Sequence, residues 1–529
     1  MKKYIFLFAL GLTASVAQSQ EISDALRYSQ DDLNGTARFR AMSGAFGALG
    51  GDLSSIYVNP AGSAVFLNNQ MGLTLSSFNI KNNSNYFGTK TSDKENSIDL
   101  NQAGAVFVFN NRKDSDWRKI SLGVNYEKTN DFTNRVFSAG TNPTNSIDKY
   151  FLSYANTGNN GAPVPQQFVN REAGESISDL YSYLGSNLPN NQYPSLNGFA
   201  AQQAMIAFYN QGFVIDADDV NNPNSTYSSL IPAGGNYYQE NSVYSTGYNG
   251  KLSFNAATSY KDKLYIGLNL NSHFTDLQRT SRFYEDNNAP LTSNYTVSMV
   301  QFDNTLNTYG TGFSFQLGAI AKLTNEVRLG LAYESSTWYN LNDELSQKLV
   351  VVSSASTGND ITDSVDPRVV NIYEAYKLQS PSKLTGSFAY VFGKSGLISI
   401  DYAIKDYSKT KFKPENDSFF NALNSNMNSM LDTTGELRIG AEYKIEALSL
   451  RAGYRYEQSP YKNGVTIGDL TGYSAGLGYR FRVGFVDFGY SLTDTKVEYV
   501  LDDYIYGVIP TVTTKTKFNR FALTLGLKF

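Results

Sequence analysis

Apolar and polar residues alternate along segments of about ten residues in the C-terminal half of the chain. At its end, one set of alternate positions is apolar and the positions between them are small or polar; the apolar set is Phe521, Leu523, Leu525, Leu527 and Phe529. The ranges 434–445, 448–459 and 469–482 show the same pattern. Because successive side chains of a β-strand point to opposite faces, each segment predicts a strand with one apolar face. Alternation alone fits both a soluble sandwich and a membrane barrel whose apolar face meets lipid.

Fourteen such strands are predicted along the chain, and their connections favour the barrel. The strands lie at 70–81, 99–110, 118–132, 243–259, 263–283, 297–323, 326–341, 382–393, 396–409, 434–445, 448–459, 469–482, 484–499 and 514–529. Long connections alternate with very short ones, which are 261–263, 324–325, 393–395 and 483–484. An even number of strands places both ends of a bacterial membrane barrel in the periplasm, with short turns there and long loops outside. We therefore predict an all-β, 14-stranded antiparallel transmembrane β-barrel over residues 69–529.

Both ends of the chain carry features of export. A basic N-terminus, a short apolar run and a small-residue cleavage site predict a secretory signal peptide over residues 1–19. That run is too short to span a bilayer as a helix, and no later segment is apolar for the roughly 18 residues that a spanning helix needs. A terminal strand ending in Phe529 looks like the signal read by the barrel-assembly machinery. We expect a protein of the Gram-negative outer membrane, in contact with its lipid and lipopolysaccharide.

Composition supports strands and argues against several classes of function. The chain has 38 Tyr, 33 Phe and no Cys, so its stability rests on backbone pairing and packing rather than on disulfides. A net charge of −4 without basic clusters argues against a nucleic-acid partner. Asp216, Asp218 and Asp219 lack the spacing of a calcium loop, and we expect no metal and no cofactor. The only histidine, His273, has lumen-facing parity, the wrong face for a lipid-directed catalytic site, and we expect no enzymatic activity.

Residues 20–68, between the signal and the first strand, show no alternation. They are rich in Gly and Ala, which allow backbones to approach each other closely, as a plug folded inside a barrel requires. The alternative is a solvated periplasmic tail. Apolar residues such as Leu49, Leu53 and Ile56 argue against free solvation, and we favour a plug, or hatch, inside the lumen.

The segment Asn59-Pro60-Ala61-Gly62 follows a Gly/Ala-rich stretch just before the first strand. Together with fourteen strands and the terminal Phe, it resembles the outer-membrane family of long-chain fatty acid transporters and aromatic-hydrocarbon channels. The resemblance implies that these four residues form a hatch motif and that the ligand is a hydrophobic small molecule such as a fatty acid. It further implies capture at an outer groove, binding beside the hatch, and release into the outer leaflet through a gap at a kink of the third strand.

Two long connections are predicted to carry amphipathic helices on the outer face. In the loop at 140–240, one helix begins near Ile177 and a second covers about 196–210; a shorter loop at 410–433 has a helix near 418–431. The two helices of the first loop either cap each other and the barrel rim or leave a groove for ligand. The candidate groove residues share the apolar faces of these helices; they are Leu180, Tyr181, Leu184, Phe199, Ile206 and Phe208.

The third predicted strand loses its apolar face towards its outer end. Lys128 and Asn130 occupy the positions that should meet lipid, and Asp131 follows. This polar break marks either the extracellular boundary of the membrane or a stretch turned away from lipid, as a lateral opening requires.

Charged residues on lumen-facing positions of the last strands are expected mainly to pair across neighbouring strands. They are Arg438, Glu442, Arg451, Arg455, Glu457, Arg480 and Asp487. A few of the arginines could instead bind a carboxylate headgroup, which matches their two donors. The rival function is a barrel component of a protein secretion system, whose partners would be proteins; the plug disfavours an open porin.

Overall fold

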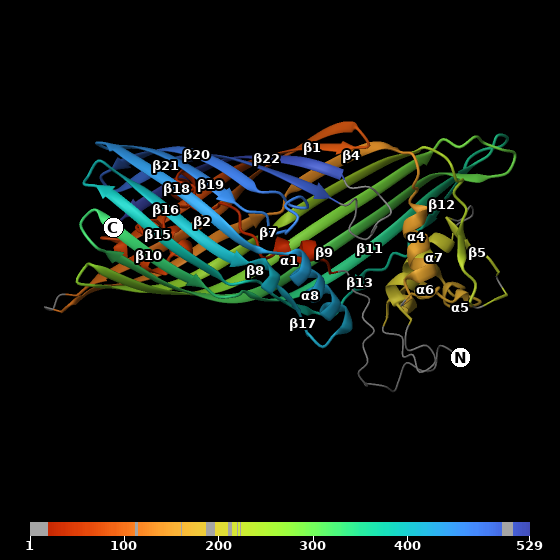
Figure 1. The fold of residues 1–529 in the computed structure, drawn as a ribbon, viewed down its shortest axis with the longest axis horizontal. Helices are drawn as coiled ribbons and strands as arrows, with labels where there is room; N and C mark the ends of the chain where they lie inside the picture. The colour runs from red at the N-terminus through yellow and green to blue at the C-terminus, as the bar shows by residue number, and fades with distance from the viewer. Residues whose placement is uncertain are drawn as a thin grey trace.

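A computed structural model describes residues 20–111, 115–159, 161–186, 196–209, 214–219, 221–222, 224–499 and 512–529. The predicted signal peptide, residues 1–19, lies outside the described residues. The protein is a closed antiparallel barrel of 14 strands that pair in chain order, with the last strand hydrogen-bonded to the first (Figure 1). The prediction of a 14-stranded barrel is confirmed.

Three of the barrel strands are broken into two pieces. In chain order the strands are β1 (Gln70–Tyr86), β2 (Thr89–Asn110), β3 (Trp117–Asp131) with β4 (Asn134–Asn142), β7 (Tyr237–Tyr260), β8 (Leu264–Asn287), β9 (Thr296–Lys322), β10 (Val327–Glu334) with β11 (Trp338–Ser354), β14 (Tyr376–Gln379) with β15 (Lys383–Phe392), β16 (Gly396–Asp406), β18 (Thr433–Ile445), β19 (Leu448–Glu457), β20 (Leu470–Phe481), β21 (Gly484–Tyr499) and β22 (Val512–Lys528). Short strands β12 (Ile361–Val365), β13 (Asn371–Ile372) and β17 (Lys411–Lys413) add to the sheet at its outer end.

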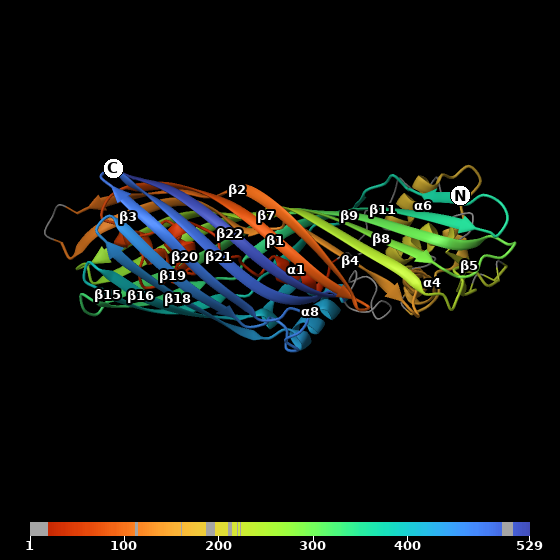
Figure 2. The same cartoon turned by 90° about the horizontal axis from the view of Figure 1, so that it is seen from above.

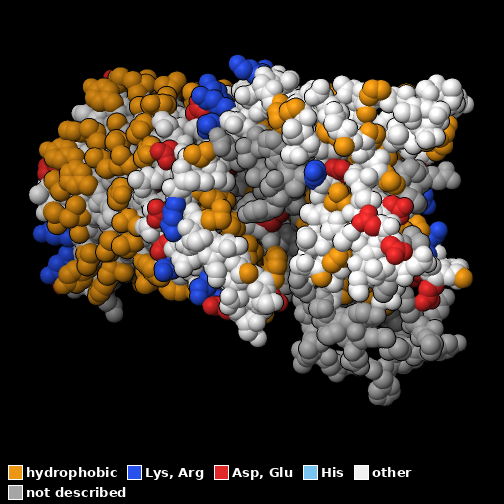
Figure 3. All heavy atoms as spheres, turned by 45° about the vertical axis from the view of Figure 1, so that its right-hand side comes forward, with side chains coloured by type: hydrophobic (Ala, Val, Ile, Leu, Met, Phe, Trp, Pro, Cys, Tyr) orange, Lys and Arg blue, Asp and Glu red, His pale blue; other side chains and the backbone are white. Residues whose placement is uncertain are grey.

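An apolar belt surrounds the end of the barrel that carries the short turns and the C-terminus. Figure 3 shows hydrophobic side chains crowded over this end, whereas the other half of the surface is mainly polar. On β22 the outward side chains of Leu523, Leu525 and Leu527 are 44–53% exposed, as lipid-facing residues are in a protein without its bilayer. No helix among the described residues is long and apolar enough to span a membrane. The belt therefore marks the membrane, and the short turns mark the periplasmic side.

On the outer side, the barrel extends well beyond the belt and encloses a helical cap. β7, β8 and β9 are 24, 24 and 27 residues long, against 10 for β19. The cap consists of α4 (Asp148–Thr157), α5 (Gln166–Val169), α6 (Ile177–Gly185), α7 (Gly198–Phe208), β5 (Ile215–Ala217) and β6 (Tyr227–Ser229). Helices α6 and α7 confirm the two predicted helices, as α8 (Ser418–Met430) confirms the one in the shorter loop. Helices α4 and α5 were not predicted.

The N-terminal segment lies inside the lumen, where the views of Figures 1 and 2 both place it. It forms α1 (Ile22–Arg27), α2 (Ala37–Ala41), α3 (Ser55–Val58) and the 3-10 helix η2 (Pro60–Val65), and most of its side chains are buried. Glycine in the wall makes room for it: a Cβ on Gly318 would lie 2.0 Å from Asn59 Oδ1, and one on Gly267 would lie 2.4 Å from the backbone of Pro60. The segment fills the lumen as the plug interpretation expects.

Candidate functional site

A cavity of about 350 Å³ lies inside the barrel on the outer side of the hatch. Its walls are α1 with the coil that follows it and the inner faces of β1, β3, β4, β7, β8 and β22. The lining residues are Ser23, Arg27, Gln30, Asp32, Ile80, Asn130, Asp131, Phe132, Asn134, Val136, Ser138, Asn241, Val243, Ser245, Leu277, Arg279, Val512, Thr514 and Phe518. This volume lies within the range of small-molecule sites in proteins.

The lining combines an apolar wall with a few charged groups. Side chains such as Phe132, Leu277 and Phe518 supply the apolar surface, and Arg27 and Arg279 supply cations. Arg27 is held beside Asp24 of the same helix turn. Most of the polar lining consists of amide and hydroxyl groups. The cavity therefore suits an apolar molecule with at most a small polar end.

One side of this cavity borders a break in the barrel wall. The ladder between β2 and β3 runs only from Asn110–Lys119 to Gln102–Glu127, and beyond that point β4 pairs with β7 alone. We call the stretch between residues 89–101 of β2 and residues 128–142 the seam. Because no β2–β3 or β2–β4 ladder pair joins its two sides among the described residues, the seam is held by side chains and by the hatch.

Both strands that flank the seam bulge where the ladder ends. On β2, Thr74 of β1 pairs with Gln102 and Leu75 with Leu100, so Asn101 is the extra residue. On β3, Lys128 pairs with Gly250 and Asn130 with Asn249 of β7, so Thr129 is the extra residue. A bulge bends its strand and re-aims a side chain. Here both extra residues turn towards the hatch, and they are 0% and 8% exposed.

The hatch coil, residues 30–35, inserts between the two bulges. The backbone N–H groups of Asp32 and Gly35 donate to Thr129 O at 3.0 Å and to Asn101 Oδ1 at 2.7 Å, respectively. The Asn34 side chain contacts both strands, donating to Thr129 O at 3.0 Å and accepting from Asn101 Nδ2 at 3.1 Å. The coil therefore replaces the missing ladder and closes the seam from inside.

The three residues predicted for a lateral opening all lie at this seam. The bulge turns Lys128 away from lipid: it is 4% exposed, and its Nζ lies 2.5 Å from Asp99 and 2.7 Å from Asp131. Asn130 donates to Gln30 O of the hatch coil at 2.9 Å. Of the two interpretations of the polar break, this geometry matches a stretch turned away from lipid.

The hatch motif fastens the hatch to the wall. Asn59 Nδ2 donates to Gly47 O at 2.7 Å and to Ala319 O of β9 at 3.0 Å, and its Oδ1 accepts from Ala61 N at 3.1 Å. Asn255 of β7 donates to Pro60 O at 2.9 Å. Gly62 O accepts from Gly51 N at 3.0 Å, which joins the motif to the Gly-rich stretch before it.

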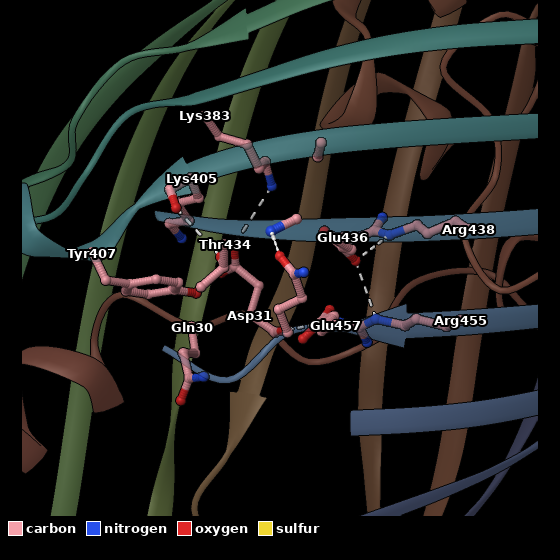
Figure 4. Close-up of a pocket in the computed structure, with 13 residues that line it drawn as sticks. Gln30, Asp31, Lys383, Lys405, Tyr407, Thr434, Glu436, Arg438, Arg455 and Glu457 are labelled. Atoms are coloured by element: carbon pink, nitrogen blue, oxygen red, sulfur yellow. Dashed lines mark hydrogen bonds and ion pairs between the residues drawn. The ribbon is translucent and has the colours of Figure 1, made fainter. Parts of the chain in front are cut away.

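A charged network anchors the hatch coil on the side opposite the seam (Figure 4). Lys383 lies 4.0 Å from Asp31 and 3.2 Å from Glu334, and Glu436 joins Arg455 at 3.1 Å with Arg438. Burial alone would raise the pKa of Asp31, but Lys405, Lys383 and Lys251 outweigh it and hold that pKa below its ordinary value. The space among these groups is only about 40 Å³, so the network is structural.

Further pairs confirm that inward charges pair across neighbouring strands. Arg451 of β19 lies 2.7 Å from Glu442 of β18 and 2.6 Å from Asp487 of β21. Arg455 also pairs with Glu457 of its own strand. Arg480 differs, because no ion pair forms on it among the described residues.

The six residues predicted to line an outer groove lie in or against the core of the closed cap. Leu180, Tyr181, Leu184 and Ile206 are 0% exposed and pack with inner-face residues of the long strands, such as Phe302. Phe199 packs against Leu345 and Tyr373, and Phe208 is partly buried against the same core. This packing matches the interpretation in which the helices cap each other and the barrel rim.

His273 is a buried wall residue. Its Nε2 lies 2.8 Å from Ser314 Oγ, and its ring packs edge-on against Tyr339. Within the described ranges, no group of His, Cys, Asp and Glu could hold a metal ion.

Sequence reasoning missed the contact between the hatch coil and the seam. Asp32, Asn34, Gly35 and Asn101 gave no local signal, because a single bulge leaves the alternation on both sides of it intact. The polar break at Lys128 was the one trace of the seam in the sequence.

The fold and site define a class: an outer-membrane barrel that is plugged by its own N-terminal segment and has a ligand-sized cavity above the plug. A family model described as "Outer membrane protein transport protein (OMPP1/FadL/TodX)" matches residues 223–529. The chain belongs to this family of Gram-negative outer-membrane transporters for hydrophobic compounds. Its assignment to transport agrees with the expectation of no enzymatic activity.

Solved structures share the fold at low sequence identity. A Pseudomonas aeruginosa FadL homologue is 13% identical, with a TM-score of 0.54 over 94% of this chain and 99% of that one. The Pseudomonas putida toluene transporter TodX is 14% identical, with a TM-score of 0.47 over 95% and 100% of the two chains. The Ralstonia pickettii toluene transporter TbuX is 13% identical, with a TM-score of 0.46 over 94% and 99%. No curated protein matches the chain.

Proposed function

We propose that the protein takes up hydrophobic small molecules such as long-chain fatty acids and releases them sideways into the outer leaflet. The observation that carries the proposal is the 350 Å³ cavity, which is apolar with a few cations and borders the seam directly. A ligand there has an apolar wall for its chain, an arginine for a carboxylate, and a short path to lipid. Among the described residues, no feature favours the alternative role in protein secretion.

Capture is the proposed first step and takes place at the cap. The apolar side chains of α6 and α7 would meet an incoming ligand only after the two helices part, because Leu180, Leu184 and Ile206 are buried in the closed state. We propose that the cap opens to admit the ligand from the lipopolysaccharide layer and closes behind it. The ligand then occupies the cavity beside the hatch.

Release is the proposed last step and takes place at the seam. Undocking of the hatch coil from Asn101 and Thr129 would leave the wall open without breaking a ladder. The seam begins at the outer edge of the membrane, since the outward residues of β1 change from Leu75, opposite Leu100, to Ser77 and Asn79 at this level. A ligand leaving there meets the acyl chains below and the polar headgroups above, which suits an amphiphile such as a fatty acid.

Uptake of a labelled long-chain fatty acid by cells that make the protein tests the proposal. Val243 lines the cavity, and Tyr244, its neighbour on β7, is 37% exposed on the outer face. We expect Val243→Trp to fill the cavity and lower uptake, and Tyr244→Trp to leave uptake at the wild-type level. Uptake equal to that of cells without the protein would reject the function, and full uptake by the Val243 variant would remove the cavity from the path.

A further inference from the structure

A second cavity, of about 280 Å³, lies on the periplasmic side of the hatch. Its roof is the hatch, and its wall is made of the strand ends next to the short turns, from β10 round to β22 and β1. The lining residues are Arg38, Leu49, Gly50, Gly51, Asp52, Val65, Gln70, Arg328, Val391, Leu397, Lys444, Ser449, Arg451, Gly478, Tyr479, Arg480, Phe485, Asp487 and Lys528. The hatch separates this cavity from the one proposed to carry the transported ligand.

Cations outnumber acids around this periplasmic cavity. Its lining has six Lys or Arg residues, against Asp52 and Asp487. Glu442, behind the lining, pairs with Arg38 at 2.8 Å and with Arg451 at 2.7 Å. These acids therefore serve cations on one part of the wall and leave a positive excess on the rest.

Three of the cations have no acidic partner within the described part of the chain. Arg328 donates to Leu49 O at 3.1 Å, and its buried Nε has no hydrogen-bond partner among the described residues. Arg480 has no ion pair there, and Lys528 has only the ring of Phe485, 5.9 Å away. Like charges held round a small cavity repel one another, and an anion bound among them would relieve that repulsion.

The rest of the lining is apolar. Leu49 and Val65 contribute from the hatch, and Val391, Leu397 and Phe485 contribute from the wall. A free inorganic anion would gain nothing from these side chains. A molecule with an anionic head and an apolar body would use both parts of the lining.

We infer that the periplasmic cavity binds the head of an anionic amphiphile, a carboxylate or a phosphate, with Arg328, Arg480 and Lys528 as its cationic ligands. A fatty acid and a phospholipid of the inner leaflet carry this chemistry. The site does not depend on the outer cavity, because it is reached from the periplasm and lies below the hatch.

A reporter at the cavity mouth tests the inference. The chain has no cysteine, so Ser395→Cys, in the turn between β15 and β16, carries an environment-sensitive dye at one position. The labelled protein, in a neutral detergent, is titrated with dodecanoate, dodecyl phosphate, dodecanol and inorganic phosphate. The first two probes separate the carboxylate from the phosphate source, and the last two offer the tail or the head alone.

We expect saturable responses to dodecanoate, dodecyl phosphate or both, and weaker binding of dodecanol and inorganic phosphate. Arg480→Gln with Lys528→Gln should raise the half-saturating concentration about tenfold or more, since each removes a charge-assisted contact. Lys263→Gln with Lys394→Gln, two exposed cations of the periplasmic turns, is the matched control and should change it little.

Equal affinity in the two double variants would overturn the assignment of the cations. Equal affinity for inorganic phosphate and dodecyl phosphate would overturn the assignment to an amphiphile. Heat-modifiable migration in gels shows whether each variant is folded. Because fatty-acid uptake is measured separately, failure of this site and failure of the proposed transport function remain distinguishable.

Discussion

Replacement of Asn101 by alanine should loosen the hatch coil from the seam. Asn101 is the bulged residue of β2, and its side chain accepts from Gly35 N at 2.7 Å and donates to Asn34 at 3.1 Å. Alanine removes both contacts and leaves the barrel ladder intact, because the flanking residues Leu100 and Gln102 keep their backbone partners on β1.

The magnitude follows from these two hydrogen bonds. Each buried bond contributes about 1 kcal/mol, and the Gly35 N–H left without an acceptor costs about 1–3 kcal/mol. The docked coil should therefore be less stable by about 2–4 kcal/mol, which multiplies the population of undocked coil about 30- to 1,000-fold. Neighbouring contacts of the coil, such as Asp32 with Thr129, remain and keep the docked state populated.

The modification rate of a single cysteine measures this change. Thr129 is 8% exposed beneath the coil, so in Thr129→Cys a maleimide reacts only after the coil undocks, and the rate follows the undocked population. We expect Asn101→Ala to raise this rate at least about 30-fold, the lower bound of that population shift. The control is Asn96→Ala, whose side chain on the same strand is exposed and bonds only Asn79 among the described residues. Equal rates in the two variants would refute the claim that the coil closes the seam.

Three further predictions concern the hatch. Deletion of residues 20–68 should convert the barrel into an ion-conducting pore in planar bilayers; unchanged conductance would show that the segment does not fill the lumen. Ser43→Cys with Ser474→Cys, whose hydroxyl oxygens lie 2.8 Å apart, should form a disulfide on mild oxidation and still allow uptake, because release needs only the coil to move. Burial raises the pKa of Asp52, so its ionised form costs stability above that pKa and not below it. Asp52→Asn should therefore be more heat-stable than wild type at pH 8, with the difference shrinking as the pH falls; a constant difference would contradict this.

The strands were predictable because their signal is local. A lipid-facing strand must alternate within its own ten or so residues, whatever it pairs with, and the ranges predicted for the barrel strands all correspond to strands of the structure. The sequence pattern does not fix how far each strand continues outside the membrane. There the outer face meets water and the inner face meets the cap, so β8 runs on to Asn287.

Helix α6 was predictable and α4 was not, for a reason visible at their N-termini. Ser176 and Asp179 form a capping box within α6 itself, a signal written in four consecutive residues. The first turn of α4 is satisfied instead by a distant residue, Glu285 of β8, which accepts from Ile147 N at 2.9 Å and from the Ser146 hydroxyl. A cap supplied by tertiary structure leaves no mark in the adjoining sequence.

The candidate site was predictable only in part. The hatch motif and the polar break at Lys128 could be found by position, and the structure brings that break to the hatch. The groove residues were placed by helical spacing, which identifies an apolar face but not what covers it; in the closed cap the partner helix and the strands cover it. The cavity above the hatch is built from seven separate chain segments, and no local pattern records their meeting.

The seam is the place where this barrel can open at least cost. Parting any other pair of neighbouring strands leaves backbone N–H and C=O groups without partners, and in lipid each such group costs several kcal/mol. Along the seam no ladder exists to be broken, and the contacts that hold it are side-chain bonds, such as Lys128 with Asp99 and Thr91 with Phe137 O, together with the hatch coil. Its position at the outer edge of the apolar belt also lets water satisfy the groups that opening exposes. An opening there can be repeated in every transport cycle, whereas an opening between β8 and β9, which are paired from Leu264 to Asp286, would unfold the wall.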